Sequence, residues 1–244
     1  MSAPLVRLER LRKEFRAVVA VEELTLELDA GEIVALVGDN GAGKSTVVNC
    51  LAGVHAPTSG RILLEGEPVS FSSPRDARRH GIEVVPQDLA LVDAQPVYMN
   101  MFLGRERVKG PLRRLDRNAM AAETAALLEE LDVRIGGAEQ PVRDLSGGQR
   151  QGVAVARAML WAQRLVLMDE PTAALGVAET RRAEELILRM RDRGRAILLV
   201  SHSLDQVLRL ADRICIMRHG RQVAVSARDE TSGDELVATI MGLR

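Results

Sequence analysis

The sequence is poor in aromatic residues, cysteine and net charge. It contains one Trp, one Tyr, three Phe and two Cys, and its formal net charge is −1. Because acidic and basic residues are interspersed, we expect no nucleic-acid partner and no polybasic membrane anchor. Cys50 and Cys215 form no CxxC pair and fall on a predicted helix and a predicted strand. We therefore expect two small buried thiols.

Long apolar runs are missing as well. The sequence has no stretch of about 18 apolar residues, the length that a membrane-spanning helix needs. Residues 1–7 lack the apolar region of a signal peptide. We expect a cytosolic chain that does not itself cross a membrane. With 244 residues and no repeat, linker or low-complexity segment, the sequence favours one α/β unit with a substantial core.

What the chain does contain is a glycine-rich loop of the form G-x-x-x-x-G-K-[ST]. It follows an apolar run, 33–37, typical of a central parallel strand covered on both faces, and it precedes a helical pattern. The strand and the helix favour a phosphate-binding loop over a plain turn with a surface lysine. Lys44 would reach the β- and γ-phosphates, and the Ser45 hydroxyl would bind Mg²⁺. The loop consists of Gly38, Asp39, Asn40, Gly41, Ala42, Gly43, Lys44, Ser45 and Thr46.

Strands dominate the chain around this loop. Residues 24–29 alternate between apolar and polar, as in a half-buried antiparallel strand, and 61–69 indicate a hairpin. Ser73 and a following proline begin a short helix. The strand 82–85 then places Gln87 at the edge where ligand sites of open α/β sheets gather. We expect Gln87 to face the phosphates, the metal shell and the attacking water.

The strand pattern disappears between 88 and 160, which predicts a mostly helical insertion. One helical face consists of Met120, Thr124, Leu127, Leu128 and Leu131. The last helix of the insertion opens at Leu145, Ser146, Gly147, Gly148 and Gln149, with Ser146 as its predicted N-cap. Two glycines there expose backbone N–H groups, so this is a second predicted phosphate-binding helix start.

Two acidic residues end the apolar strand 164–170. We expect Asp169 to hold Mg²⁺ together with Ser45, and Glu170 to polarise the attacking water. A helix over about 177–193 and the buried strand 196–200 follow, and His202 comes after that strand. His202 would bind the γ-phosphate, although a histidine at a strand end also serves simply as a satisfied polar residue. A helix, a hairpin over 218–221 and a closing helix after Ser232 complete the chain.

In this order, these motifs resemble the ATP-binding cassette (ABC) family over essentially the whole chain. The Leu-Ser-Gly-Gly-Gln signature at 145–149 is the most specific of them. The resemblance implies a P-loop NTPase with a RecA-like core, an antiparallel β edge and a helical subdomain. We expect one domain over 1–244, with 1–87 and 161–244 as the core and 88–160 as the helical part. It also implies that Phe15, flanked by charged residues in a loop-like setting, stacks on the adenine of ATP.

The resemblance further implies a head-to-tail dimer of two copies. In it, Ser146, Gly147 and Gly148 of one copy bind the γ-phosphate held by the other. Because the chain carries one set of motifs, the second set must come from a homodimer or a partner.

The segments 102–106 and 170–177 resemble cassettes of monosaccharide importers. That resemblance implies a separate membrane permease, which keeps the chain at the inner face of the membrane, and a sugar-binding protein. An importer for another small solute and a soluble cassette ATPase without a transport role are the alternatives. A nucleotide-gated binding module is disfavoured by Glu170. This resemblance implies that the transported sugar would be recognised by other chains, so the sequence does not identify it.

Most ABC cassettes carry an aspartate where Gly176 stands, and that aspartate helps to couple the two sites of the dimer. Glycine has no carboxylate, so the loop after Glu170 either works through main-chain contacts or merely turns the chain into the helix near 177.

Overall fold

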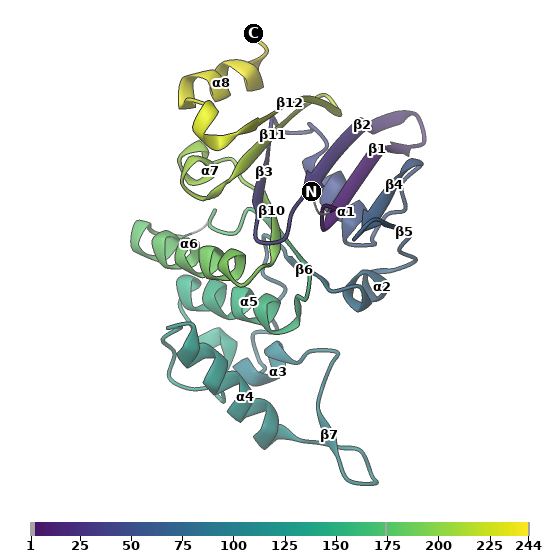
Figure 1. Cartoon of the computed structure of the whole chain (residues 1–244). Helices are drawn as coiled ribbons and strands as arrows, with labels where there is room; N and C mark the ends of the chain where they lie inside the picture. The colour runs from purple at the N-terminus through teal and green to yellow at the C-terminus, as the bar shows by residue number, and fades with distance from the viewer. Residues whose placement is uncertain (1–2, 174, 244) are drawn as a thin grey trace. The chain divides into compact units, whose positions relative to one another are not determined.

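The computed structural model describes residues 3–173 and 175–243. By its contacts the chain divides into two compact units. The first contains residues 1–84, 162–170 and 188–244, and the second contains 85–161 and 171–187. Figure 1 shows the whole chain coloured from the N-terminus to the C-terminus.

The first unit is built around a ten-stranded mixed sheet, in which β6 is one edge strand. The strand order is β5-β4-β1-β2-β12-β11-β3-β10-β9-β6. The strands are β1 (Val6–Phe15), β2 (Val18–Leu28), β3 (Ile33–Val37), β4 (Ser59–Leu64), β5 (Glu67–Val69), β6 (Ile82–Val85), β9 (Leu165–Asp169), β10 (Ala196–Val200), β11 (Arg213–Arg218) and β12 (Arg221–Ala227). The helices of this unit are α1 (Lys44–Leu51), α2 (Pro74–Arg79), α7 (Leu204–Leu210) and α8 (Gly233–Met241), with a 3₁₀ turn at Arg228–Glu230.

The central strand β3 is buried at every residue, and it pairs in parallel with β10 and β11. Val34 and Leu36 face a core that includes Val47, Val48 and Leu51 of α1. Ala35 and Val37 face a second core that includes residues of α7 and α8. Because both faces are covered, an almost continuous apolar run is what this strand requires, and the predicted central parallel strand is confirmed.

The antiparallel edge is formed by β5, β4, β1 and β2, which pair as neighbours in that order and are seen side by side in Figure 1. The predicted antiparallel strand at 24–29 is confirmed as the end of the longer strand β2. The hairpin over 61–69 is confirmed as β4 and β5. The loop-like setting expected for Phe15 is wrong, because Phe15 is the last residue of β1 and pairs with Val18.

The second unit is mostly helical. It contains α3 (Val97–Met101), α4 (Arg117–Glu130), α5 (Gly147–Trp161) and a 3₁₀ turn at Val142–Asp144. The helix α6 (Val177–Asp192) begins in this unit and ends in the first. The predicted face of α4 is confirmed by the burial of Met120, Thr124 and Leu128.

The predicted mostly helical insertion 88–160 also contains one element that the strand pattern did not indicate. A small antiparallel hairpin, β7 (Val108–Lys109) with β8 (Arg114–Leu115), precedes α4. Its strands have two residues each and are exposed, so they carry no alternation of buried and exposed residues that a sequence pattern could reveal.

Both cysteines are buried free thiols, as the sequence predicts. Burial raises the pKa of Cys50 to about 11 and that of Cys215 to about 12. Neither thiol is therefore a reactive thiolate at neutral pH.

Candidate functional site

The phosphate loop connects β3 to α1 and lies against neighbouring backbone. Gly38 and Gly43 have φ values of 147° and 102°. A Cβ at Gly38 would collide with the carbonyl oxygen of Met217, and one at Gly43 with that of Ala20. Both positions therefore require glycine. Gly43 is also the N-cap of α1 and offers no side-chain cap, so the first N–H groups of α1 are suited to bind an anion.

Lys44 is folded over this loop. Its Nζ donates to the carbonyl oxygens of Gly38, at 2.7 Å, and Asp39, at 2.9 Å. The residue is 7% exposed. Burial lowers the pKa of Lys44, while the nearby charges of Glu170, Asp169 and Asp39 act in the opposite direction. The ammonium group is thus held by the phosphate loop, within electrostatic reach of Asp169 and Glu170.

Ser45 and Asp169 come together at the end of β9. A hydrogen bond from the Ser45 side chain and the charges of Lys44 and His202 stabilise the Asp169 carboxylate, but burial is the larger effect and raises its pKa. Among the described residues there is no cluster of three or more His, Cys, Asp or Glu side chains that could hold a metal ion. One carboxylate and one hydroxyl suit Mg²⁺, which keeps several waters and takes further oxygens from substrate phosphates.

Glu170 has a left-handed backbone with φ of 52°, an uncommon conformation for a residue other than glycine. Its N–H donates to the carbonyl oxygen of Val200 at 2.9 Å, which ties it to the end of β10. The strained residue is therefore held in place by the neighbouring strand β10.

His202 is the closest partner of the Glu170 carboxylate. The ring Nε2 lies 3.2 Å from Oε1, and the backbone N–H of His202 donates to Oε2 at 3.3 Å. Oε1 is buried and accepts no hydrogen bond from the described residues. Nε2 and Oε1 are therefore within ion-pair distance but are not aligned for a hydrogen bond. Burial raises the pKa of Glu170, the charge and N–H of His202 oppose this rise, and Asp169 adds to it. A carboxylate with a raised pKa and a free oxygen can orient and polarise a water.

The His202 loop is supported by residues that the sequence reading missed. Ser201 is 3% exposed, donates to Gln206 Oε1 at 2.9 Å and accepts from the N–H of Ser203 at 3.1 Å. Ser203 Oγ in turn accepts from the N–H of Gln206 at 3.4 Å. The spacing of Ser203 and Gln206 fits a capping box, so this signal was available in the sequence.

Phe15 lies in the first unit at the end of β1 and is 39% exposed. The ring of His55 packs edge-on against it with 5.0 Å between centroids, and Lys13 Nζ lies 4.9 Å from the Phe15 centroid. Lys13 also donates to the carbonyl oxygen of Ala56 at 2.8 Å. Lys13 and His55, which the sequence reading did not single out, therefore fix the ring of Phe15.

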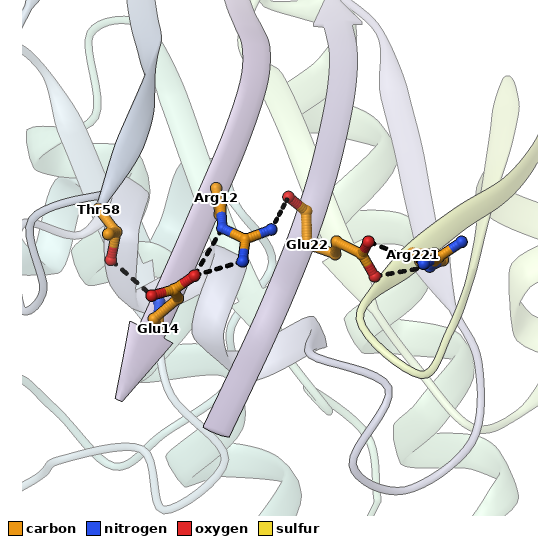
Figure 2. Close-up of polar contacts among 5 residues, drawn as sticks. All are labelled: Arg12, Glu14, Glu22, Thr58 and Arg221. Carbon is orange, nitrogen blue, oxygen red and sulfur yellow. Dashed lines mark hydrogen bonds and ion pairs between the residues drawn. The ribbon is translucent and has the colours of Figure 1, made fainter. Parts of the chain in front are cut away.

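A chain of polar contacts holds this end of β1, as Figure 2 shows. The N–H of Glu14 donates to Thr58 Oγ1 at 3.0 Å, and the Glu14 carboxylate pairs with Arg12. Arg12 also donates to the carbonyl oxygen of Glu22, whose carboxylate accepts two hydrogen bonds from Arg221 at 2.6 and 2.7 Å. These pairs are partly exposed, so each contributes at most about 1 kcal/mol; together they connect β1, β2, β12 and the turn before β4.

The signature residues lie in the second unit. Ser146 Oγ accepts from the N–H of Gln149 at 3.3 Å, and Gln149 Oε1 accepts from the N–H of Ser146 at 2.9 Å. This reciprocal capping box confirms Ser146 as the N-cap of α5. Gln149 also donates to the carbonyl oxygen of Arg134 at 2.8 Å. Leu145 is buried, whereas Ser146 and Gly147 are exposed.

Gln87 is exposed and also lies in the second unit. Arg157 supports the following segment by donating to the carbonyl oxygens of Leu89 and Ala90, both at 2.8 Å. The predicted contact of Gln87 with a metal shell stays a prediction.

Of the predicted site residues, the phosphate loop, Asp169, Glu170 and His202 all lie in the first unit.

The segment 170–177 includes Ala174, which lies outside the described residues. Gly176 does not have a left-handed backbone, and among the described residues a Cβ there would meet Glu179 Oε2, at 3.3 Å. A special backbone conformation at Gly176 is therefore not what distinguishes this loop.

In the stretches 3–173 and 175–243, the helices are all too short or too polar to span a bilayer.

Comparison with known proteins places these motifs in context. The ABC transporter family matches residues 21–173. The chain is 42% identical over 232 residues to the xylose/arabinose import ATP-binding protein XylG of Sulfolobus acidocaldarius, covering 95% of this chain and 92% of that protein. It is 46% identical to the fructose import ATP-binding protein FrcA of Rhizobium meliloti, covering 99% and 95%. It is also 39% identical to the ribose import ATP-binding protein RbsA 2 of Streptomyces avermitilis, of which it spans about half, 47%.

Solved structures share the fold. A nucleotide-free ATP-binding cassette from an ABC transporter superposes with a TM-score of 0.81 at 24% identity, covering 99% of this chain and 96% of that one. A dimeric ATP-binding cassette in a post-hydrolysis state, bound to ADP and Pi, gives 0.78 at 22% identity, covering 91% and 98%. The predicted α/β fold of a P-loop NTPase, with its antiparallel edge, is confirmed.

Proposed function

We propose that this chain, which belongs to the ABC transporter family, is the ATP-hydrolysing subunit of an importer that takes up a monosaccharide. The hydrolytic part rests on one observation: the Ser45 and Asp169 pair and the Glu170 and His202 pair meet beside Lys44 at the phosphate loop. The transport part rests on similarity over nearly the whole length to two sugar import ATP-binding proteins.

In this proposal the phosphate loop binds the triphosphate of ATP. The N–H groups at the start of α1 and the Lys44 ammonium bind the β- and γ-phosphates. Ser45 and Asp169 would hold Mg²⁺, which neutralises charge on the phosphate oxygens when bound. Phe15, steadied by Lys13 and His55, stacks on the adenine.

Glu170 orients and polarises the attacking water through its carboxylate. Its raised pKa strengthens it as a base, and its position is fixed by the bonds to Val200 and His202. His202 binds the γ-phosphate from the same edge of the sheet. Gln87 would contribute an amide oxygen toward that Mg²⁺ and the attacking water. Residue chemistry and the order of the motifs support these proposed roles.

We also propose that two copies form a head-to-tail dimer. Ser146, Gly147 and Gly148 then bind the γ-phosphate held by the other copy, through the exposed start of α5. The dimeric cassette with ADP and Pi supports such an assembly. A membrane permease and a sugar-binding protein complete the importer, and contact with the permease keeps the chain at the inner face of the membrane.

Reconstitution tests the proposal. The chain is co-expressed with candidate permeases, purified by a tag on the permease, and placed in liposomes with a sugar-binding protein. ATP-dependent uptake of labelled xylose, fructose and ribose is measured beside the Glu170→Gln variant, which should show none. ATP hydrolysis that no permease captures or stimulates would identify a soluble ATPase instead, and uptake of another solute only would refute the sugar assignment.

A further inference from the structure

The first turn of α6 is capped by its own glutamate. The N–H of Gly176 donates to Glu179 Oε2 at 3.0 Å, and the N–H of Thr180 donates to the carbonyl oxygen of Gly176 at 2.9 Å. Gly176 thus directly precedes α6 in the N-cap position, and Glu179 reaches back to it from three residues further on. The carboxylate satisfies an N–H group that the helix itself leaves without an acceptor.

The same side chain packs against the signature segment. A Cβ placed on Gly148 would lie 2.7 Å from Cγ and 3.0 Å from both Cβ and Cδ of Glu179. The 2.7 Å distance is shorter than real Cβ contacts, so the stem of Glu179 would have to shift to admit any other residue at 148. Beside it, a Cβ on Gly147 would lie 3.8 Å from Leu175 Cδ2.

Glu179 therefore touches two segments with different predicted tasks. Its carboxylate holds the backbone at Gly176, and its stem covers Gly148 at the start of α5. Gly176 has no side chain with which to make either contact. All these residues belong to the second unit, and Glu179 is only partly exposed.

We propose that Glu179 is a positioning residue for ATP hydrolysis. It holds the turn at 175–176 against the phosphate-binding start of α5, so that both segments contact the second copy as one surface. The inference rests on the proposed dimer. Glu179 touches no nucleotide. It acts by placing Gly148 and the neighbouring backbone N–H groups. Within one copy it connects the turn at 175–176 to α5, a connection that Gly176 cannot make because it has no side chain.

Three variants in a Glu170→Gln background test this link. Glu179→Ala removes both contacts. Glu179→Gln keeps the stem and an oxygen that can accept from Gly176. Glu185→Ala, at an exposed glutamate of the same helix, is the matched control. Dimerisation is followed by light scattering against ATP concentration, and the affinity of the monomer for ATP is measured separately.

We expect Glu179→Ala to raise the ATP concentration for half-maximal dimerisation about tenfold, the size of one lost hydrogen bond to a charged acceptor. The monomer's dissociation constant should stay within about twofold, since the phosphate loop is untouched. Glu179→Gln and Glu185→Ala should dimerise like the parent. An unchanged midpoint in Glu179→Ala, an equal loss in Glu179→Gln, or a parallel loss of monomer affinity would each overturn the proposal.

Amide hydrogen exchange, measured without nucleotide, tests the link between the two segments independently of dimer formation. If Glu179 links the two segments, Glu179→Ala should speed amide exchange in peptides covering both 145–151 and 175–180, while Glu185→Ala should change neither. Faster exchange in 175–180 alone would mean that Glu179 only caps α6, and the proposal would fail. A parent that never dimerises with ATP would refute the dimer, while the exchange result would still decide whether the link exists.

Discussion

Glu170 and His202 contact each other through both side chain and backbone: Nε2 lies 3.2 Å from Oε1, and the His202 N–H donates to Oε2 at 3.3 Å. The carboxylate is nearly buried, with 13% of its side chain exposed, whereas 55% of the His202 side chain is exposed. The histidine thus contacts a largely desolvated carboxylate, while more than half of its own side chain remains exposed. Hydrolysis and stability should both depend on this pair.

We expect Glu170→Gln to bind ATP and to lose turnover by about 10²-fold or more, because the amide keeps the shape of the side chain and cannot accept a proton. Steady-state phosphate release and equilibrium binding of ATP measure the two effects separately. Glu185→Gln on the exposed face of α6 is the control. Parental hydrolysis by Glu170→Gln would show that another group activates the water.

The same substitution should stabilise the fold at neutral and higher pH. Burial raises the pKa of Glu170 above its ordinary value of 4.5, so between the two pKa values the folded chain binds more protons than the unfolded chain. The free energy of unfolding therefore falls as pH rises through this window. Glutamine avoids the buried charge, and we expect a gain on the order of 1 kcal/mol at pH 8.

Urea unfolding at pH 8, 6 and 4.5 checks this prediction. The gain of Glu170→Gln over the parent should shrink toward the lowest pH, because protonation of Glu170 progressively removes the buried charge. A gain that does not depend on pH would point to a loss of backbone strain or to packing in place of desolvation.

Lys44→Ala should weaken ATP binding by about 10- to 100-fold, the range for one or two lost charge-assisted hydrogen bonds to phosphate. The ammonium lies at the phosphate loop, where it is held by the carbonyl oxygens of Gly38 and Asp39. Titration calorimetry with ATP gives the dissociation constant. Lys109→Ala, in the exposed hairpin β7–β8, should bind like the parent, and equal binding by Lys44→Ala would remove Lys44 from the phosphate site.

The sequence predicted the parts of the fold that have a strong local pattern. The run 33–37 identified β3 because both faces of that strand are buried, and the spacing of Met120, Thr124 and Leu128 identified the buried face of α4. The hairpin β7–β8 was missed because two exposed residues per strand leave no periodic signal.

Contacts between distant segments were harder to predict. The loop at 38–46 and the pair Asp169 and Glu170 were recognised as motifs, and parallel strands bring their ends together. The packing of His55 and Lys13 on Phe15 depends on a turn that follows α1 and lies beside the end of β1. The contact of Glu179 with Gly148 joins residues 31 positions apart in sequence. Neither contact is indicated by a periodic pattern in the local sequence.

Gly176→Asp should change the cooperativity of ATP hydrolysis in the assembled transporter and leave the monomer's affinity for ATP nearly unaltered. An aspartate at the start of α6 would cap the helix through its own side chain. Its Cβ would meet Glu179 Oε2 at 3.3 Å, so two carboxylates would compete for the same N–H groups and repel each other. Glu179 should then move away from Gly148, although the new carboxylate could reach the second copy.

The Hill coefficient for ATP and the monomer's dissociation constant, measured for both forms, decide between these roles of position 176. Gly176→Asn is the control, because it caps the helix without a second negative charge. If Gly176→Asp changes the Hill coefficient and Gly176→Asn does not, the charge at this position couples the two sites. If both variants keep the parental Hill coefficient, position 176 only turns the chain into α6, and Glu179 remains the residue through which this segment is held.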